Sequence, residues 1–189
     1  MNFDVLIIGA GPSGLSAGLR LAQLAKKNKK ELNVCIVEKG SEVGAHILSG
    51  AVLEPKALNE LIPDWKSQDS PIKTEAKKDN FFLLTKNNYF KLPTPPQMKN
   101  DGNYIVSLGN FCRWLAKQAE EMGVNIFPGF SASEILYDEK TNKVIGVRTG
   151  DQGIDKYGKQ LENYQQGYDL LAKQTIFAEG CHGSLTKKL

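Results

Sequence analysis

The sequence lacks the features that mark metal-binding, disulfide-rich and integral membrane proteins. Its three cysteines, Cys35, Cys112 and Cys181, lie too far apart for a Cys-x-x-Cys motif, a zinc spacing or a disulfide framework, so a reducing compartment is the simplest interpretation. It has no apolar run of about 18 residues that could span a bilayer, and no signal or transit peptide pattern. Its 189 residues, without internal repeats, are enough for one domain with a core.

A large charge of one sign is also missing. The formal net charge is only +3, and the lysines are not interleaved with aromatic residues as in single-strand-binding proteins, so nucleic acid is not an expected partner. One dense basic stretch, residues 26–30, follows a helical pattern. Cations suit the carboxyl end of a helix, and this stretch is interpreted as a solvated helix end.

What the sequence does contain is a glycine-rich turn between an apolar strand and a helix. Residues 5–8 are an unbroken apolar run, which is typical of a parallel strand buried on both faces. Gly9, Gly11 and Gly14 follow in a Gly-x-Gly-x-x-Gly pattern, and helical spacing of apolar residues begins at Leu15. This layout predicts a dinucleotide-binding βαβ unit.

Each glycine of the turn has a separate expected role. Gly9 lets the chain turn off the strand, Gly11 lets the backbone approach the phosphates, and Gly14 lets the helix sit close to the sheet. The pyrophosphate is expected at the helix start near Ser13, where unpaired N–H groups and the helix dipole favour negative charge.

An acidic residue, Glu38, ends the second apolar strand at residues 34–37. A carboxylate there can accept hydrogen bonds from both ribose hydroxyls and would repel the 2′-phosphate of NADP. An ordinary exposed glutamate at a strand end is the open alternative.

A second strand-to-bend transition occurs near the end of the chain, where residues 175–178 lead into Glu179, Gly180 and Gly183. Both bends are expected at the carboxyl edge of one sheet, where the second could complete a pocket for the longer FAD molecule. We therefore favour FAD over NAD. Adjacent side chains rarely point together, so Cys181 and His182 are not interpreted as a nucleophile pair.

The small-residue segment 44–51 predicts a loop close to a flavin ring or its ribityl chain, with a plain surface loop as the alternative. A short helix is expected at 56–61 and a surface loop at 64–80. Strands at 81–85 and 89–92 form a plausible hairpin, either packed or facing substrate or membrane, and 93–98 is expected to be irregular.

Further along the chain we expect a helix from Leu108 that is capped by Gly123, and a strand at 124–127. A hairpin is expected at 134–147, followed by a polar, glycine-rich stretch at 150–168.

Several stretches are distinctive together: Gly-Ala-Gly-Pro-Ser-Gly-Leu-Ser at 9–16, Val-Glu-Lys at 37–39, Gly-Ala-His-Ile-Leu-Ser-Gly-Ala at 44–51, Pro-Asp-Trp-Lys at 63–66, Gly-Asn-Tyr-Ile-Val-Ser-Leu-Gly-Asn at 102–110, and Ile-Phe-Ala-Glu-Gly-Cys-His-Gly-Ser-Leu at 176–185. Essentially the whole chain resembles the amino-terminal part of the electron transfer flavoprotein–ubiquinone oxidoreductase family, and the short leader is similar to that of bacterial members. The resemblance implies a truncated α/β protein: a Rossmann-like, glutathione-reductase-like FAD-binding domain with β-hairpin insertions.

The resemblance also implies the residues of the site. Candidate cofactor contacts are Gly9, Gly11, Pro12, Ser13, Gly14, Glu38, Lys39, Gly44, Ala45, His46, Leu48, Ser49, Gly50, Ala132, Ala178, Glu179, Gly180 and Gly183. The chemistry belongs to the flavin, so no acid, base, nucleophile or metal ligand is assigned within this chain.

The implied activity is electron transfer from reduced electron transfer flavoprotein to ubiquinone, using FAD and a [4Fe–4S] cluster. Family members are about three times longer, so the cluster ligands and most of the quinone domain are expected to be absent from this chain. Residues 70–105 are expected to be an insertion toward the quinone and membrane side.

A peripheral place is implied on the cytoplasmic face of the bacterial inner membrane, or on the mitochondrial inner membrane in a eukaryote. The alternatives are a geranylgeranyl-reductase-like FAD-dependent reductase or hydroxylase, and an inert nucleotide-binding fragment.

Overall fold

The computed structural model describes residues 1–48, 50–155 and 157–189. These residues form two compact units: Met1–Ile47 together with Cys112–Leu189, and Leu48–Phe111. Each unit is described by itself. The helix α3 (Leu108–Glu121) crosses the division between them.

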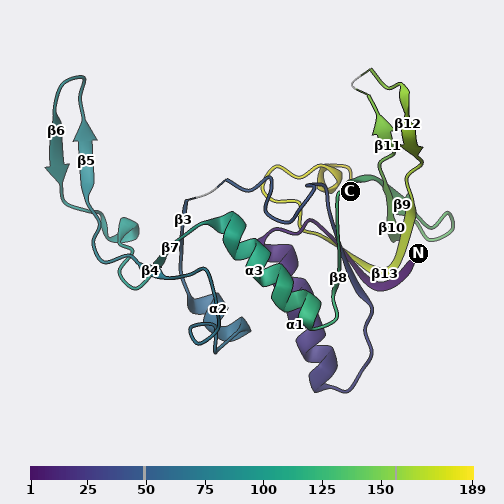
Figure 1. Cartoon of the computed structure of the whole chain (residues 1–189), viewed down its shortest axis with the longest axis horizontal. Helices are drawn as coiled ribbons and strands as arrows, with labels where there is room; N and C mark the ends of the chain where they lie inside the picture. The colour runs from purple at the N-terminus through teal and green to yellow at the C-terminus, as the bar shows by residue number, and fades with distance from the viewer. Residues whose placement is uncertain (49, 156) are drawn as a thin grey trace. The chain divides into compact units, whose positions relative to one another are not determined.

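The first unit is built on a six-stranded sheet with the order β8-β2-β1-β13-β10-β9 (Figure 1). Its strands are β1 (Asn2–Ile8), β2 (Val34–Glu38), β8 (Asn125–Pro128), β9 (Ala132–Tyr137), β10 (Val144–Thr149) and β13 (Asp169–Phe177). The strands β8, β2, β1 and β13 run parallel, while β10 and β9 continue the sheet antiparallel. The α/β class and the hairpin at 134–147 are confirmed.

The helix α1 (Pro12–Lys27) connects β1 to β2, as the apolar spacing after the glycine turn predicts. Proline at the first helical position lacks only an N–H that would have no partner in the helix, and its fixed φ suits a helix start. A Cβ placed at Gly18 would lie 2.8 Å from the Ile36 side chain and 3.5 Å from that of Ile7. Glycine at this position therefore permits close packing of α1 on the sheet.

The other face of the sheet carries a buried apolar cluster. Its members come from β1, β2, β9, β10, β13 and a final 3-10 helix, η2 (Leu185–Lys187): Leu6, Ile8, Cys35, Val37, Ile135, Val147, Leu170 and Leu185. Because successive strand residues alternate between faces, β1 and β2 are buried on both sides. That explains why their sequences are continuous apolar runs rather than alternating ones.

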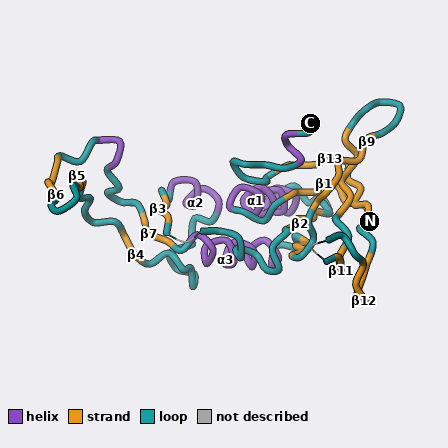
Figure 2. Tube along the Cα trace, turned by 90° about the horizontal axis from the view of Figure 1, so that it is seen from above, coloured by secondary structure: helices purple, strands orange, loops and turns teal. Residues whose placement is uncertain are grey.

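The helix α3 ends where the sequence predicts. Gly123 has φ +88°, its N–H donates to the Glu120 carbonyl, and the Val124 N–H donates to the Ala119 carbonyl. These two bonds satisfy the last carbonyls of the helix, with glycine in the left-handed region. In Figure 2, α1 and α3 are drawn as two separate purple helices.

The polar stretch at 150–168 contains two strands that the sequence pattern did not reveal. These are β11 (Gln152–Ile154) and β12 (Gln160–Gln165), which pair antiparallel. Their side chains are mostly exposed and polar, so hydrophobic alternation gave no signal.

The second unit has a three-stranded antiparallel sheet in the order β3-β7-β4. Its elements are β3 (Ala51–Leu53), α2 (Lys56–Leu61), β4 (Thr74–Glu75) and β7 (Tyr104–Val106). The prediction of a surface loop at 64–80 is wrong, because Trp65, Ser70 and Ile72 are buried. The Trp65 ring packs edge-on against Tyr104 at 5.3 Å, and its Nε1 donates to Asn59 at 2.7 Å.

A hairpin of β5 (Phe81–Leu84) and β6 (Tyr89–Leu92) belongs to the same unit, as predicted. The expectation that 93–98 is irregular is wrong for its second half, where Pro96–Met98 forms the 3-10 helix η1. Proline at the first position of this turn supplies the φ that a helical turn requires.

Candidate dinucleotide-binding site

The two predicted bends lie side by side at one edge of the sheet. The strands β1 and β13 pair in parallel, with Ile8 opposite Phe177, and the N–H of Ala178 donates to the Ile8 carbonyl at 2.8 Å. The prediction that both bends share the carboxyl edge is confirmed. Along the parallel strands the order is third, second, first, fourth, so the strand order reverses between β1 and β13. Ligands of open α/β sheets bind at this switch point.

Two of the three glycines allow the two bends to lie close together, because neither residue has a Cβ. Gly9 has φ +106°, and a Cβ there would lie 2.5 Å from the Ala178 carbonyl oxygen. A Cβ at Gly14 would lie 2.0 Å from the Gly9 carbonyl oxygen and 3.3 Å from the Ala178 Cβ. The role expected for Gly14, close packing of helix on sheet, is thus carried largely by Gly18, while Gly14 packs against the two bends.

Gly11 differs from its neighbours, because a Cβ at this position would meet no atom within 4 Å. It is the N-cap of α1, in an extended conformation, and Pro12 follows at the first helical position. The first turn of α1 contains no acidic residue, and Ser13 is exposed. A helix start of this kind presents free N–H groups and the positive end of the dipole, which suits a diphosphate.

Glu38 is half-buried and joins the glycine turn to the following loop. One carboxylate oxygen accepts a hydrogen bond from the Ala10 N–H at 2.9 Å, and the other accepts one from the Gly40 N–H at 2.8 Å. Each oxygen keeps a second lone pair for a ribose hydroxyl. The buried Cys112 thiol lies within the influence of this charge: burial raises the pKa of Cys112 to about 11, and Glu38 contributes to the rise.

Sequence reasoning missed Gly40, which directly follows the Glu-Lys pair. It is buried, and a Cβ there would lie 3.2 Å from the Glu38 carboxylate and 3.6 Å from the Ala45 Cβ. Its carbonyl accepts from the Gly129 N–H at 2.7 Å. The sequence feature that could have identified Gly40 is its position two residues after Glu38, the acidic residue that ends β2.

The loop after Glu38 is also tied to β9 and α3. The Phe130 N–H donates to the Glu38 carbonyl at 2.9 Å, which brings the start of β9, and with it Ala132, toward the site. Arg113 of α3 donates to the Val43 carbonyl at 3.4 Å and lies 3.7 Å from the Glu42 carboxylate. These contacts hold residues 40–45 near the carboxyl end of β2.

The second bend is organised by Glu179, whose carboxylate turns toward the end of the chain. It accepts from the N–H groups of Leu185 and Thr186 at 3.1 and 2.8 Å and from the Thr186 hydroxyl at 2.5 Å. Burial acts to raise the pKa of Glu179, but hydrogen bonds from Thr186, Leu185 and Ser184 outweigh it, so the pKa lies below its usual value. The Glu179 side chain thus shapes the bend by bonding to the residues that follow it.

The remaining predicted contacts belong to both units. Lys39, Ala45 and His46 are exposed in the first unit, and Gly44 has φ +85°. Leu48, which is 91% exposed, and Gly50, with φ +88°, belong to the second unit, and Ser49 lies outside the described residues. Within the first unit, the structure therefore brings together Gly9, Gly11, Gly14, Glu38 and Ala178, with Ala45 beside Gly40.

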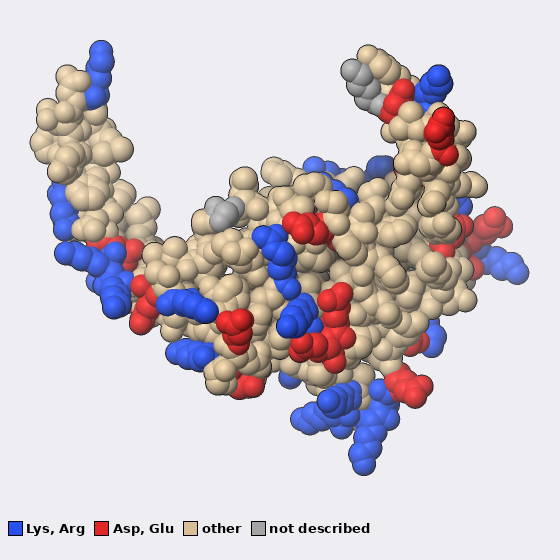
Figure 3. Space-filling view, viewed as in Figure 1, with Lys and Arg blue, Asp and Glu red and all other residues tan. Residues whose placement is uncertain are grey.

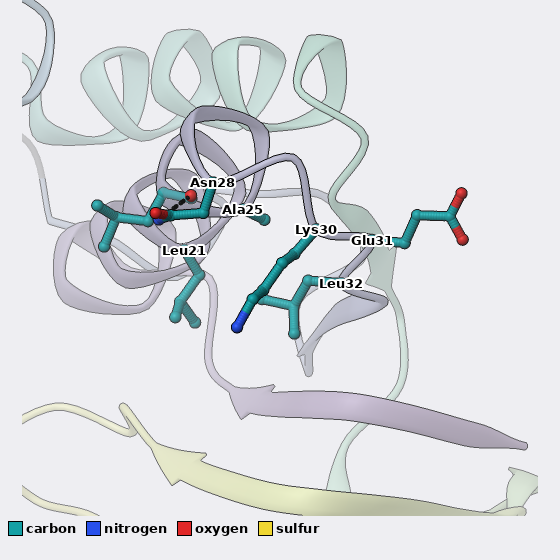
Figure 4. Close-up of a pocket in the computed structure, with 7 residues that line it drawn as sticks. Leu21, Ala25, Asn28, Lys30, Glu31 and Leu32 are labelled. Atoms are coloured by element: carbon teal, nitrogen blue, oxygen red, sulfur yellow. Dashed lines mark hydrogen bonds between the residues drawn. The ribbon is translucent and has the colours of Figure 1, made fainter.

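A pocket of about 380 Å³ lies at the other end of α1 (Figure 4). It is lined by Leu21, Leu24, Ala25, Asn28, Lys30, Glu31 and Leu32. Figure 4 shows Lys30 reaching toward it, while the Glu31 carboxylate points away. α1 has 16 residues and is roughly 24 Å long, and the pocket is lined by its last two turns, so the pocket is separate from the dinucleotide site at the start of the helix.

Within the described ranges, no three His, Cys, Asp or Glu side chains gather as metal ligands would. Cys35 and Cys112 are buried, and burial raises the pKa of Cys35 to about 12. Such protonated thiols do not suit an iron–sulfur cluster, which needs thiolates. Nor does any helix in the described part of the chain combine the length and apolar character needed to cross a bilayer.

Comparison with known proteins also indicates a dinucleotide-binding fold. Residues 7–64 match a family model for an NAD(P)-binding Rossmann-like domain. The electron transfer flavoprotein-ubiquinone oxidoreductase of Dictyostelium discoideum, a mitochondrial protein, is 60% identical over 100% of this chain and 31% of its own length. The Pseudomonas aeruginosa protein of that name is 55% identical over 100% of this chain and 35% of its own length.

Over its whole length the chain resembles part of the electron transfer flavoprotein-ubiquinone oxidoreductases. The resemblance that the motifs indicated is thereby confirmed. The chain spans about a third of the length of these relatives. The mitochondrial protein of Bos taurus, 49% identical over 98% of this chain and 30% of its own length, shows that the similarity extends across bacteria and eukaryotes.

Solved structures with lower identity share the fold of this chain. A geranylgeranyl bacteriochlorophyll reductase-like protein from Thermoplasma acidophilum has a TM-score of 0.64 at 21% identity, covering 95% of this chain and 39% of the neighbour. Aklavinone-11 hydroxylase, solved with FAD and aklavinone, has a TM-score of 0.61 at 19% identity, covering 98% and 34%. At this identity the likeness concerns the fold alone.

Proposed function

We propose that the chain is the FAD-binding part of an oxidoreductase that takes electrons from reduced electron transfer flavoprotein and passes them to ubiquinone. The observation that carries the proposal is the 49–60% identity to oxidoreductases of that name across 98–100% of the chain. The paired bends at the switch point supply the site that such a cofactor needs.

FAD is favoured over NAD(P) although the matching family model carries the latter name. A second bend lies beside the first, at the position where FAD, which is longer than NAD, would extend. The carboxylate of Glu38 disfavours NADP, since a 2′-phosphate would meet a negative charge whose oxygens already bind backbone N–H groups.

The residues present fit FAD in the following way. The N–H groups at the start of α1 and the open space at Gly11 would hold the pyrophosphate, Glu38 the ribose, and the backbone of 178–183 the remaining part of the cofactor. Bound FAD would supply the capacity to accept and release electrons, and the chain's own residues would bind and orient it. The [4Fe–4S] cluster of the implied whole protein does not fit the residues described here, so no step is assigned to it.

The β5–β6 hairpin supports a contact with the membrane and its quinone. Its side chains Leu83, Leu84, Tyr89 and Phe90 are more than half exposed, although such residues are normally buried. We infer that residues 70–105 form an insertion toward the membrane, and that the whole protein is peripheral on the inner membrane of a bacterium or a mitochondrion.

Titration of the 189-residue chain with FAD, followed by quenching of flavin fluorescence, tests the cofactor. Saturable quenching that NAD and NADP do not reverse is the expected result. Binding of NAD in preference to FAD, or no quenching at all, would contradict the proposal; the second outcome would favour an inert fragment. The electron donor is then tested by adding reduced electron transfer flavoprotein without oxygen, separating the two proteins, and measuring the loss of absorbance of the flavin bound to this chain.

A geranylgeranyl-reductase-like activity is the second candidate, and the observation in its favour is the fold likeness at 21% identity. It predicts fast direct reduction of the bound flavin by NAD(P)H. Reduction by electron transfer flavoprotein but not by NAD(P)H would exclude it.

Replacing Glu38 with Gln should weaken FAD binding. Gln has one acceptor oxygen, so one of the two N–H groups that Glu38 now satisfies loses its partner, together with the charge that favours ribose hydroxyls. A charge-assisted hydrogen bond is worth about 1.5–3 kcal/mol, or roughly 10- to 100-fold in Kd. Glu31→Gln removes the same charge from an exposed position in the same unit and should leave Kd unchanged in the fluorescence titration.

A further inference from the structure

The bend at residues 179–184 is closed by one carboxylate. Besides the N–H groups of Leu185 and Thr186 and the Thr186 hydroxyl, Glu179 accepts a hydrogen bond from the N–H of Ser184. Ser184 is the N-cap of η2, and its own side chain makes no capping bond. The N–H groups at a helix start need an acceptor from outside the helix, and Glu179 supplies it from the other end of the bend.

Both ends of this bend are fixed to the sheet. At its start the Ala178 N–H donates to the Ile8 carbonyl at 2.8 Å, and at its end the Leu185 side chain, which is 1% exposed, belongs to the apolar cluster on one face of the sheet. Glu179 joins these two ends directly, because its backbone follows Ala178 and its carboxylate bonds to the Leu185 N–H. The width of the bend is therefore set by this one side chain.

Two glycines make the backbone of the bend flexible unless another group holds it. Gly180 has φ +78° and Gly183 has φ +47°, both in the left-handed region. A Cβ at Gly183 would lie 3.3 Å from the Thr186 hydroxyl oxygen and 3.9 Å from the Glu179 carboxylate, whereas a Cβ at Gly180 would meet no described atom within 4 Å. One side of the bend thus packs against the Glu179–Thr186 pair, and the backbone at Gly180 is open, as it is at Gly11.

All the hydrogen bonds to the Glu179 carboxylate come from uncharged donors of residues 184–186. They outweigh the effect of burial and hold the pKa of Glu179 below its usual value, so the side chain is ionised at neutral pH. The carboxylate makes its bonds to the chain itself, which is typical of a residue that fixes backbone rather than of one that contacts an anionic cofactor.

We propose that Glu179 and Thr186 are positioning residues for the flavin half of FAD, an inference that rests on the cofactor proposed above. They fix the bend in the shape that receives the cofactor and do not contact it. A bend that is already ordered loses less conformational entropy on binding, so the affinity for FAD is higher. Without the carboxylate, the two glycines would let residues 179–184 sample other shapes, and binding would have to order them.

Titration of the 189-residue chain and its variants with FAD, followed by quenching of flavin fluorescence, tests the proposal. Glu179→Gln keeps the size of the side chain but loses the charge and one acceptor oxygen, so Kd for FAD should rise about tenfold, as expected for a charge-assisted hydrogen bond. Thr186→Val keeps the shape of an exposed residue and loses only the hydroxyl, so Kd should rise about threefold. Thr186→Ser retains the hydroxyl and should bind FAD as the unmodified chain does.

Asp138 provides a matched control in the same unit. In the turn between β9 and β10, its carboxylate accepts hydrogen bonds from the N–H and the hydroxyl of Thr141, each at 2.7 Å, and from the Lys140 N–H at 3.2 Å. Asp138→Asn removes the same kind of bond and the same charge as Glu179→Gln. Acidic and basic side chains are interspersed on the face drawn in Figure 3, so one charge changes the overall field little. Asp138→Asn should leave Kd for FAD unchanged.

Visible circular dichroism of the flavin at saturating FAD separates positioning from a general loss of stability. The signal depends on the surroundings of the flavin ring, so Glu179→Gln and Thr186→Val should change it and Asp138→Asn should not. An equal loss of affinity in Glu179→Gln and Asp138→Asn, with the same flavin signal in both, would overturn the proposal, since a merely structural role would then explain the result.

The remaining outcomes separate this inference from the function on which it rests. A Glu179→Gln variant that binds FAD as tightly as the unmodified chain would overturn the inference and leave the proposed function standing. Failure of the unmodified chain to bind FAD would contradict the proposed function itself. If far-UV circular dichroism shows that Glu179→Gln does not fold, the pair at the exposed position 186 decides: equal Kd for Thr186→Val and Thr186→Ser would overturn the inference.

Discussion

An alanine at position 11 should leave the fold intact and abolish tight FAD binding. The added Cβ would meet no protein atom within 4 Å, and the φ of Gly11, −78°, is one that alanine readily adopts. The methyl group would instead occupy the open space where the diphosphate must approach the backbone. We expect Kd for FAD to rise about 100-fold, roughly 2.7 kcal/mol, with an unchanged thermal midpoint. Fluorescence titration and circular dichroism measure the two quantities.

Gly9→Ala is the matched control for this substitution. Its Cβ would lie 2.5 Å from the Ala178 carbonyl oxygen, at φ +106°, so the two bends would have to separate. Backbone strain of this kind costs roughly 1–3 kcal/mol, and the thermal midpoint should fall. If Gly11→Ala binds FAD as tightly as the unmodified chain, the diphosphate does not lie at this helix start.

Replacing Trp65 with Ala should unfold the second unit far more easily. The ring is 1% exposed, packs against Tyr104 and bonds to Asn59, so its removal leaves a cavity and removes the largest buried side chain of that unit. Truncations of this kind cost about 3–5 kcal/mol. Urea unfolding followed by circular dichroism should reveal an earlier transition, and trypsin should cleave faster within residues 48–111.

Trp65→Phe provides a graded comparison. It keeps an aromatic ring near Tyr104 but loses the hydrogen bond to Asn59, which is worth about 1 kcal/mol. The expected order of stability is therefore the unmodified chain, then Phe, then Ala. An Ala variant with an unchanged urea midpoint would contradict the burial of this ring.

The parts that sequence reasoning predicted well are those in which local pattern and tertiary environment agree. β1, the glycine turn, α1 and β2 follow one another within 38 residues, and their apolar periodicity reflects burial directly. The β9–β10 hairpin was readable for the same reason, whereas the β5–β6 hairpin was readable from two apolar and aromatic runs around a polar turn, although most of its side chains are exposed. The β11–β12 hairpin was missed because its side chains face water, and Trp65 was missed because a single buried ring in a polar stretch has no period.

Within the site, the sequence by itself determined which residues could bind a dinucleotide: glycines at a strand-to-helix turn, an acidic residue at the next strand end, and a second small-residue bend. Only the tertiary structure decided which of these residues contact one another and which remain open to a ligand. Parallel pairing of β1 with β13, two strands more than 160 residues apart in the chain, places Ala178 against Gly9 and Gly14 and leaves Gly11 free. These assignments depend on distances between segments remote in sequence, and no local propensity encodes such distances.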